Sequence, residues 1–177
     1  MRILALVGSL RAASLNLAAC RAAMALAPPR CAVVLHGLGD LPLYNPDLEA
    51  AMPPAAARLR DAVAGAGALL VASPEYAHGI SGVLKNALDW LVSDERFPGK
   101  PVALLNTSPR ARHAWEAAAE TLRTMSARVI EEASITLPLL GHHASRETIL
   151  ADAAASARLA AALAALAGAA GSGPPDG

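Results

Sequence analysis

The feature that most constrains the fold of this chain is a regular alternation of short apolar runs with longer helical patterns. The apolar runs occupy residues 3–7, 31–35, 68–72, 101–105 and 128–135, and we expect each of them to form a buried strand. The helical patterns occupy residues 15–26, 53–65, 82–91, 112–126 and 146–167. Strands that alternate with helices in this way form a parallel sheet covered by helices on both faces.

Five such strands in a chain of 177 residues predict an α/β, flavodoxin-like three-layer sandwich. The expected core is a five-stranded parallel sheet in the order 2-1-3-4-5 with helices on both faces. The length suits a single domain, which we expect to span residues 1–167. Residues 168–177 contain mostly glycine, alanine, serine and proline, and are expected to form a disordered tail.

The balance of charge argues against two classes of partner. The formal net charge is zero, so we expect no binding to nucleic acid and none to an anionic membrane. The N-terminal apolar run is too short for a signal peptide, and Arg158 interrupts the alanine-rich end of the chain. Cys20 and Cys31 lack redox or zinc spacing, and His142 and His143 suit a solvated loop better than a metal site. We therefore expect a cytoplasmic protein without a metal.

The loop after the first strand has the composition of an anion site. Gly8 allows a sharp turn at the strand end, and Ser14 suits the N-cap of the following helix. The first N–H groups of that helix have no intrahelical partner and carry the positive end of the helix dipole. Ser9 and Asn16 add short polar groups, and Arg11 suits bidentate phosphate binding. The same residues would equally suit a capped turn with a solvated arginine.

Other nucleotide sites do not match this loop. No further glycine follows Gly8 until Gly37, and His36 stands where a dinucleotide fold places an acidic residue for the ribose. The Gly-Lys-Ser/Thr signature of a phosphate-binding P-loop does not occur. A receiver domain would need a carboxylate cluster near the first strand, but no acidic residue precedes Asp40. A monophosphate, as in FMN, is the simplest anion that remains.

A polar and aromatic loop follows the third strand, at residues 73–81. Aromatic residues make up only 3% of the chain, so Tyr76 in this loop is informative: its ring suits packing beside a flavin or a quinone. Pro74 stiffens the turn, and Gly79 permits close approach of the backbone. Ser81 suits the N-cap of the third helix.

Two motifs together resemble a known family. Residues 73–90 read Ser-Pro-Glu-Tyr-Ala-His-Gly-Ile-Ser-Gly-Val-Leu-Lys-Asn-Ala-Leu-Asp-Trp, and residues 8–16 read Gly-Ser-Leu-Arg-Ala-Ala-Ser-Leu-Asn. Both closely resemble the NADPH-dependent FMN reductase family, which includes quinone, chromate and azo-dye reductases. The resemblance covers residues 1–140, because residues 41–49 also look like the family's segment after strand two. It implies FMN as cofactor, NADPH or NADH as hydride donor, and a small-molecule acceptor such as a quinone or free flavin.

The resemblance also implies particular site residues. Contacts to FMN would come from Ser9, Arg11, Ser14, Leu15, Asn16, Pro74, Glu75, Tyr76 and Ala77, and contacts to substrate from His78 and Gly79. Residues 74–76 would line the flavin ring largely through backbone groups. The sequence departs from the family pattern at two positions, because Ala77 replaces the usual asparagine and Ser81 a frequent proline. The first departure removes one polar side chain from the loop.

A third loop completes the expected site. The fourth strand lies beside the third in the predicted order, so residues 106–110 should reach the flavin ring. Thr107 and Ser108 suit hydrogen bonds to its polar edge, and Arg110 or Arg112 suits a phosphate of the nicotinamide nucleotide. For the two arginines, a turn before the fourth helix, capped by Ser108, is an equally good interpretation.

The resemblance implies an enzyme whose cofactor carries the chemistry, so we expect no catalytic side chain. Hydride would pass from the nicotinamide to FMN, and electrons would then pass to the acceptor at the same face. Two alternatives remain: a flavodoxin-type electron carrier, and a relative that has kept the fold and lost FMN. A flavodoxin would be strongly acidic and would flank the ring with aromatic residues, whereas this chain is neutral.

The resemblance further implies a homodimer or a homotetramer. Residues 41–52 and the third helix are the candidate interface elements, with Leu43, Trp90 and Trp115 as anchors. Burial in the core is the competing interpretation for Trp90. The sequence contains no motif that distinguishes NADH from NADPH as the donor.

Overall fold

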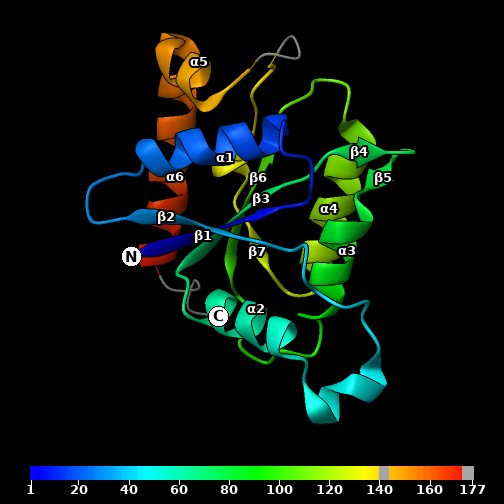
Figure 1. The fold of residues 1–177 in the computed structure, drawn as a ribbon. Helices are drawn as coiled ribbons and strands as arrows, with labels where there is room; N and C mark the ends of the chain where they lie inside the picture. The colour runs from blue at the N-terminus through cyan, green and yellow to red at the C-terminus, as the bar shows by residue number, and fades with distance from the viewer. Residues whose placement is uncertain (140–143, 173–177) are drawn as a thin grey trace.

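The computed structural model of the chain describes residues 1–139 and 144–172. Its centre is a parallel sheet made of β1 (Arg2–Val7), β2 (Ala32–His36), β3 (Ala68–Ala72), β6 (Pro101–Asn106) and β7 (Arg128–Val129). These strands lie in the order β2-β1-β3-β6-β7 (Figure 1). All four neighbouring pairs are parallel. The predicted order 2-1-3-4-5 is therefore confirmed.

Helices cover both faces of this sheet (Figure 1). One face carries α1 (Leu15–Ala25), α5 (Arg146–Ala151) and α6 (Ala153–Gly171), and the other carries α2 (Pro54–Ala64), α3 (Gly82–Asp89) and α4 (Arg112–Thr124). Successive side chains of a strand point to opposite faces, which divides the core between the two layers. In β3, Leu70 packs with the first set of helices, whereas Leu69 and Val71 pack with the second. The protein is the predicted flavodoxin-like three-layer sandwich.

The fifth strand, predicted as one continuous piece, is broken in two. β7 and β8 (Ile135–Thr136) both pair with β6, and the 3-10 turn η2 (Glu131–Ala133) separates them. Ser134 accounts for the break. Its hydroxyl donates to the Ile130 carbonyl at 2.8 Å and accepts the Leu104 N–H at 3.0 Å. A side chain thus takes the position in the ladder that a continuous strand would give to its backbone.

The last helical segment, predicted as one helix over residues 146–167, divides at Asp152. The Asp152 carboxylate accepts the N–H groups of Ala154 and Ala155 at 2.9 and 3.0 Å. These contacts make Asp152 the N-cap of α6 and end α5 at the preceding residue. Aspartate favours such capping over a helix-interior position, which explains the break.

α6 is longer than predicted. It continues to Gly171, so the segment predicted as a disordered tail from residue 168 is helical at its start. The Arg128 guanidinium holds this end by donating to the carbonyls of Ala169 and Ser172. Residues 173–177 of the predicted tail, and the two histidines 142 and 143 of the predicted solvated loop, lie outside the described residues.

Within residues 1–139 and 144–172, α6 is the one helix long and apolar enough to cross a membrane, by length and composition alone. Its mean hydropathy is 1.5 over this stretch. The leucines of α6 face the protein interior, since Leu159, Leu163 and Leu166 are buried against the sheet. Of the apolar stretch as a whole, 22% is buried inside the structure.

The loop after β2 is fixed on α3. Trp90 Nε1 and Asn86 Nδ2 both donate to the Pro42 carbonyl, at 2.8 and 3.0 Å, and the Tyr44 N–H donates to Asn86 Oδ1 at 2.8 Å. The Tyr44 ring stands edge-on to Trp90, with ring centroids 5.1 Å apart, and the loop then forms the 3-10 turn η1 (Pro46–Ala51). Trp90 is fully buried. Of its two interpretations, core burial is therefore correct and the interface anchor is wrong.

Candidate functional site

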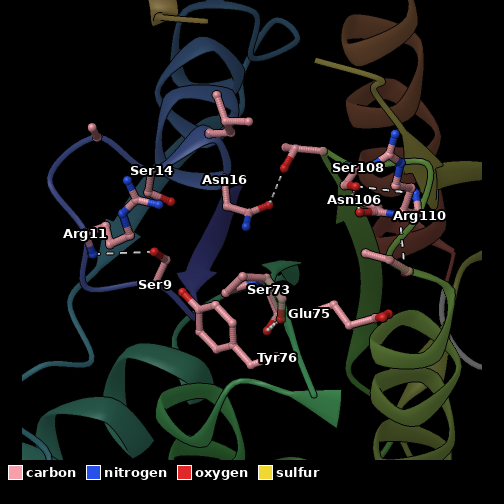
Figure 2. Close-up of a pocket in the computed structure, with 15 residues that line it drawn as sticks. Ser9, Arg11, Ser14, Asn16, Ser73, Glu75, Tyr76, Asn106, Ser108 and Arg110 are labelled. Carbon is pink, nitrogen blue, oxygen red and sulfur yellow. Dashed lines mark hydrogen bonds between the residues drawn. The ribbon is translucent and has the colours of Figure 1, made fainter. Parts of the chain in front are cut away.

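A cavity of about 390 Å³ opens at the carboxyl ends of β1, β3 and β6 (Figure 2). Parallel α/β sheets bind ligands at this edge, and the volume is in the range of small-molecule sites. The loops after the three strands supply the lining: Ser9, Arg11, Ala13, Ser14, Leu15, Asn16, Ser73, Pro74, Glu75, Tyr76, Asn106, Thr107, Ser108, Arg110 and Ala111. The structure thus brings together most of the site residues predicted from the sequence.

The loop after β1 ends in a capped helix with excess positive charge. Ser14 Oγ accepts the Leu17 N–H at 3.3 Å, which confirms Ser14 as the N-cap of α1. The first turn of α1 contains no acidic residue, so no side chain within it offsets the positive end of the helix dipole. Arg11 lines the cavity and, in the part of the chain that the structure describes, pairs with no carboxylate.

A buried hydrogen bond joins the first and third loops. Thr107 Oγ1 donates to Asn16 Oδ1 at 3.0 Å, and each residue is only 5% exposed. Because this bond occupies the amide oxygen of Asn16, its NH₂ group is left to donate. Figure 2 shows that nitrogen turned into the space between the loops. A phosphate or a ring carbonyl of a ligand in the cavity can therefore accept a hydrogen bond from this NH₂ group.

The end of β1 lies in close contact with the loop after β3. A Cβ at Gly8 would lie 2.7 Å from Ser81 Oγ and 2.9 Å from Ser73 Oγ. Close approach, rather than an unusual backbone angle, therefore requires glycine here. Ser73 Oγ accepts the Ser81 N–H at 3.3 Å, a bond that the family's frequent proline could not make. Ser81 Oγ accepts the Leu84 N–H at 3.1 Å, which confirms Ser81 as the N-cap of α3.

Glu75 serves a neighbouring helix. Its Oε2 accepts the N–H of Ala114, in the first turn of α4, at 2.9 Å. The residue before α4 is Ala111, which has no side chain able to cap, so Glu75 supplies the missing acceptor from a distant part of the chain. Glu75 therefore shapes the cavity wall, and proton transfer by this carboxylate would leave α4 without its cap.

The loop after β3 contains a hairpin that the sequence pattern did not predict. β4 (Glu75–Tyr76) and β5 (Gly79–Ile80) pair in antiparallel fashion around a two-residue turn. The turn residues Ala77 and His78 have left-handed φ angles of 48° and 60°. Two-residue turns of this type favour asparagine and glycine, because both central residues need positive φ. Backbone conformation thus accounts for the family's usual asparagine at position 77.

Three residues predicted to bind ligand lie outside the lining of the cavity. Ala77 and His78 form the exposed turn, and Gly79 begins the second strand of the hairpin. Tyr76 remains at the cavity, with 55% of its surface exposed. The two-residue turn carries the chain past the cavity, so the lining from this loop ends at Tyr76.

Residues 106–110 were expected to reach the site, but Asn106, the last residue of β6, was not predicted as a lining residue in its own right. Asn106 ends a wholly buried strand, and its Oδ1 accepts the Ser108 N–H at 3.0 Å. A polar residue at the end of such a strand is the signal that identifies it. The other missed lining residues are Ala13, Ser73 and Ala111. Arg110 lines the cavity, whereas Arg112 lies outside the lining and pairs with Glu116 at 3.7 Å.

These features define a class of protein. A flavodoxin-like sandwich with a cavity beside the N-terminus of α1 and the ends of three parallel strands is a mononucleotide-binding α/β domain. More narrowly, the chain belongs to the NADPH-dependent FMN reductase family, whose model matches residues 1–138. The family resemblance carried by the two loop motifs is confirmed.

Individual relatives agree with this assignment. The chain is 43% identical over 111 residues to an NAD(P)H-dependent FMN reductase of Pseudomonas aeruginosa and 42% identical over 109 residues to a quinone reductase of Pseudomonas putida. These matches cover 61% and 59% of this chain, and only 60% and 59% of the relatives' own lengths. The solved flavoenzyme NAD(P)H:(acceptor) oxidoreductase FerB of Paracoccus denitrificans superposes with a TM-score of 0.78 at 27% identity, covering 94% of this chain and 97% of that one.

Proposed function

We propose that this protein is an FMN-dependent NAD(P)H oxidoreductase that reduces a quinone or a similar flat acceptor, or free flavin. The observation that carries the proposal is the convergence of three strand-end loops on one cavity. Arg11, which pairs with no carboxylate among the described residues, and the N-terminus of α1 lie at its edge. The family membership and the relatives described above support the same activity.

The residues of the cavity fit FMN. Arg11, the N-terminal N–H groups of α1 and the hydroxyl of Ser9 suit its phosphate, because they combine positive charge with hydrogen-bond donors. The free NH₂ of Asn16 suits a ribityl oxygen or a phosphate oxygen. The backbone at Pro74 and the ring of Tyr76 would then flank the isoalloxazine.

Bound FMN would supply the two-electron chemistry, with hydride entering from the nicotinamide and electrons leaving to the acceptor. The protein's own residues bind, orient and exclude water. None of these residues needs to transfer a proton. This agrees with the role of Glu75, whose carboxylate already accepts a hydrogen bond from the Ala114 N–H. Arg110, which pairs with no carboxylate in the described residues, suits a phosphate of the nucleotide donor.

We also infer a cytoplasmic homodimer or homotetramer. Leu43 is 83% exposed on a loop that the side chains of Asn86 and Trp90 hold in place. A fixed loop that presents a large apolar side chain suits a protein interface. The half-buried Trp115 remains the second anchor candidate. Size-exclusion chromatography with light scattering at micromolar concentration tests this inference, and a monomer would contradict it.

The decisive experiment combines spectroscopy with turnover. We expect purified protein supplemented with FMN to retain a flavin spectrum and to oxidise NADH or NADPH when a 1,4-benzoquinone is added. If the purified protein takes up no FMN, the result would support the alternative that this chain has kept the fold and lost its cofactor. Flavin that stays bound without steady turnover would support the electron carrier.

A matched pair of variants tests the phosphate site. Arg11→Ala should weaken FMN binding roughly tenfold to a hundredfold, as expected for the loss of a hydrogen bond to a charged group. Arg21→Ala, an exposed arginine on the body of α1 and remote from the cavity lining, should leave FMN affinity unchanged. Equal effects of the two changes would contradict the assignment of Arg11 to the phosphate.

A further inference from the structure

The tip of the β4–β5 hairpin makes a contact that the proposed activity does not use. The imidazole of His78 stacks on that of His113, with ring centroids 4.3 Å apart and an interplanar angle of 28°. His78 belongs to the left-handed turn of the hairpin, and His113 belongs to the first turn of α4. Both residues are exposed and neither lines the cavity.

The hairpin cannot hold its own shape. Each of its strands has two residues, and an isolated two-stranded hairpin is at best marginally stable in water. Both turn residues adopt left-handed backbone angles without being glycine or asparagine, which adds strain. Such a conformation persists only where neighbouring structure holds it in place.

α4 is the element that holds it, because α4 packs against both strands of the hairpin (Figure 1). Two specific contacts fasten the pair. Glu75, at the start of the hairpin, accepts the Ala114 N–H, and His78, in its turn, stacks on His113. Tyr76 lies between these two attachment points and lines the cavity.

We propose that His78 and His113 are positioning residues: their stacked rings hold the β4–β5 hairpin on α4 and thereby fix Tyr76 at the cavity. The effect of the stack on turnover rests on the proposed oxidoreductase function, whereas its effect on the hairpin does not. Fixing Tyr76 orients a flat acceptor, so loss of the stack raises the KM for a quinone more than it lowers kcat.

The test uses three variants of the FMN-saturated protein. His113→Ala removes the stack. His78→Asn removes it from the other side while keeping a residue that tolerates a left-handed φ. His113→Phe keeps an aromatic ring that can stack on His78. His36→Asn, which changes a histidine at the end of β2, is the control.

At about pH 7.5, His113→Ala and His78→Asn should each speed amide hydrogen exchange in residues 75–80 and raise the quinone KM, by roughly twofold to tenfold for one aromatic pair. His113→Phe should match the unmodified protein. The control His36→Asn should match the unmodified protein as well.

Unchanged exchange in both stack-removing variants would overturn the proposal, and so would an equally large speeding of exchange in His36→Asn. If the unmodified protein reduces no quinone, the proposed function fails, yet the exchange measurement still decides the role of the stack. A collapse of kcat with an unchanged KM would show that the pair does something other than position Tyr76.

Discussion

The first loop and the β4–β5 hairpin form two walls of one cavity, and they are built in opposite ways. The first loop is closed by the Ser14 cap and by the buried bond between Asn16 and Thr107, so the sheet and α1 fix it directly. The hairpin has two-residue strands and a strained turn, and depends on side-chain contacts with α4. A site of this kind has one wall set by the core and a second wall that depends on contacts with a neighbouring helix.

The first loop, which we call the fixed wall, should tolerate a substitution least at its closest contact. Gly8→Ala should lower the free energy of unfolding by about 1–3 kcal/mol, because the added Cβ would overlap the hydroxyls of Ser73 and Ser81. Urea unfolding measures this loss. Gly37→Ala, where no atom lies within 4 Å of the new Cβ, should stay within about 0.5 kcal/mol. Similar losses at both positions would mean that close packing does not define this wall.

The bond between the first and third loops is the next test. Thr107→Val leaves the buried oxygen of Asn16 without its donor and should cost about 1–3 kcal/mol of unfolding free energy. The matched control is Thr121→Val, whose hydroxyl donates to the Ala117 carbonyl within α4 and should change stability by less than about 0.5 kcal/mol. If the two variants unfold at the same urea concentration, the bridge does not stabilise the fixed wall.

The hairpin wall should lose stability when its attachment to α4 is removed. Glu75→Ala removes the acceptor for the Ala114 N–H and should cost about 1 kcal/mol, as for a helix N-cap. Glu75→Gln keeps an oxygen acceptor and should lose less. Glu116→Ala, an exposed residue on the same helix, should cost less than about 0.5 kcal/mol. Thermal unfolding ranks the three, and a Glu116→Ala loss as large as that of Glu75→Ala would argue against the cap.

The smallest expected effect is a gain in stability. Ala77→Asn places a residue that tolerates left-handed angles in the strained turn and should raise the free energy of unfolding by about 0.5–1 kcal/mol. The same change in a helix, Ala161→Asn on the exposed face of α6, should lower it by about 0.5 kcal/mol. Opposite signs would establish the strain, whereas a loss at both positions would show that the turn is relaxed.

Sequence reasoning succeeded where long patterns decide structure and failed where single side chains do. The buried runs define the strand order because each must lie between two layers of helices. The break of the fifth strand at Ser134 and the division of the last helix at Asp152 follow from hydrogen bonds of one side chain, which periodicity does not report. The hairpin strands are too short to produce any pattern.

The same distinction applies to the site. Ser14, Asn16 and Thr107 were predictable because they follow buried strands at the edge where ligands bind. His78 was expected to contact substrate from its place in the motif, yet the turn carries it out of the lining and onto His113. A contact between residues far apart in the chain, and outside any shared motif, has no signature in a single sequence.

The break in the fifth strand has a consequence for the whole molecule in a crowded cell. Where a sheet ends in a long straight strand, its row of free N–H and C=O groups invites another chain to extend the sheet. Here that border consists of β7 and β8, each two residues long, with the η2 turn between them. No uninterrupted template is left on that side, so the interruption protects this edge of the sheet from edge-to-edge pairing, while the opposite edge remains the continuous strand β2.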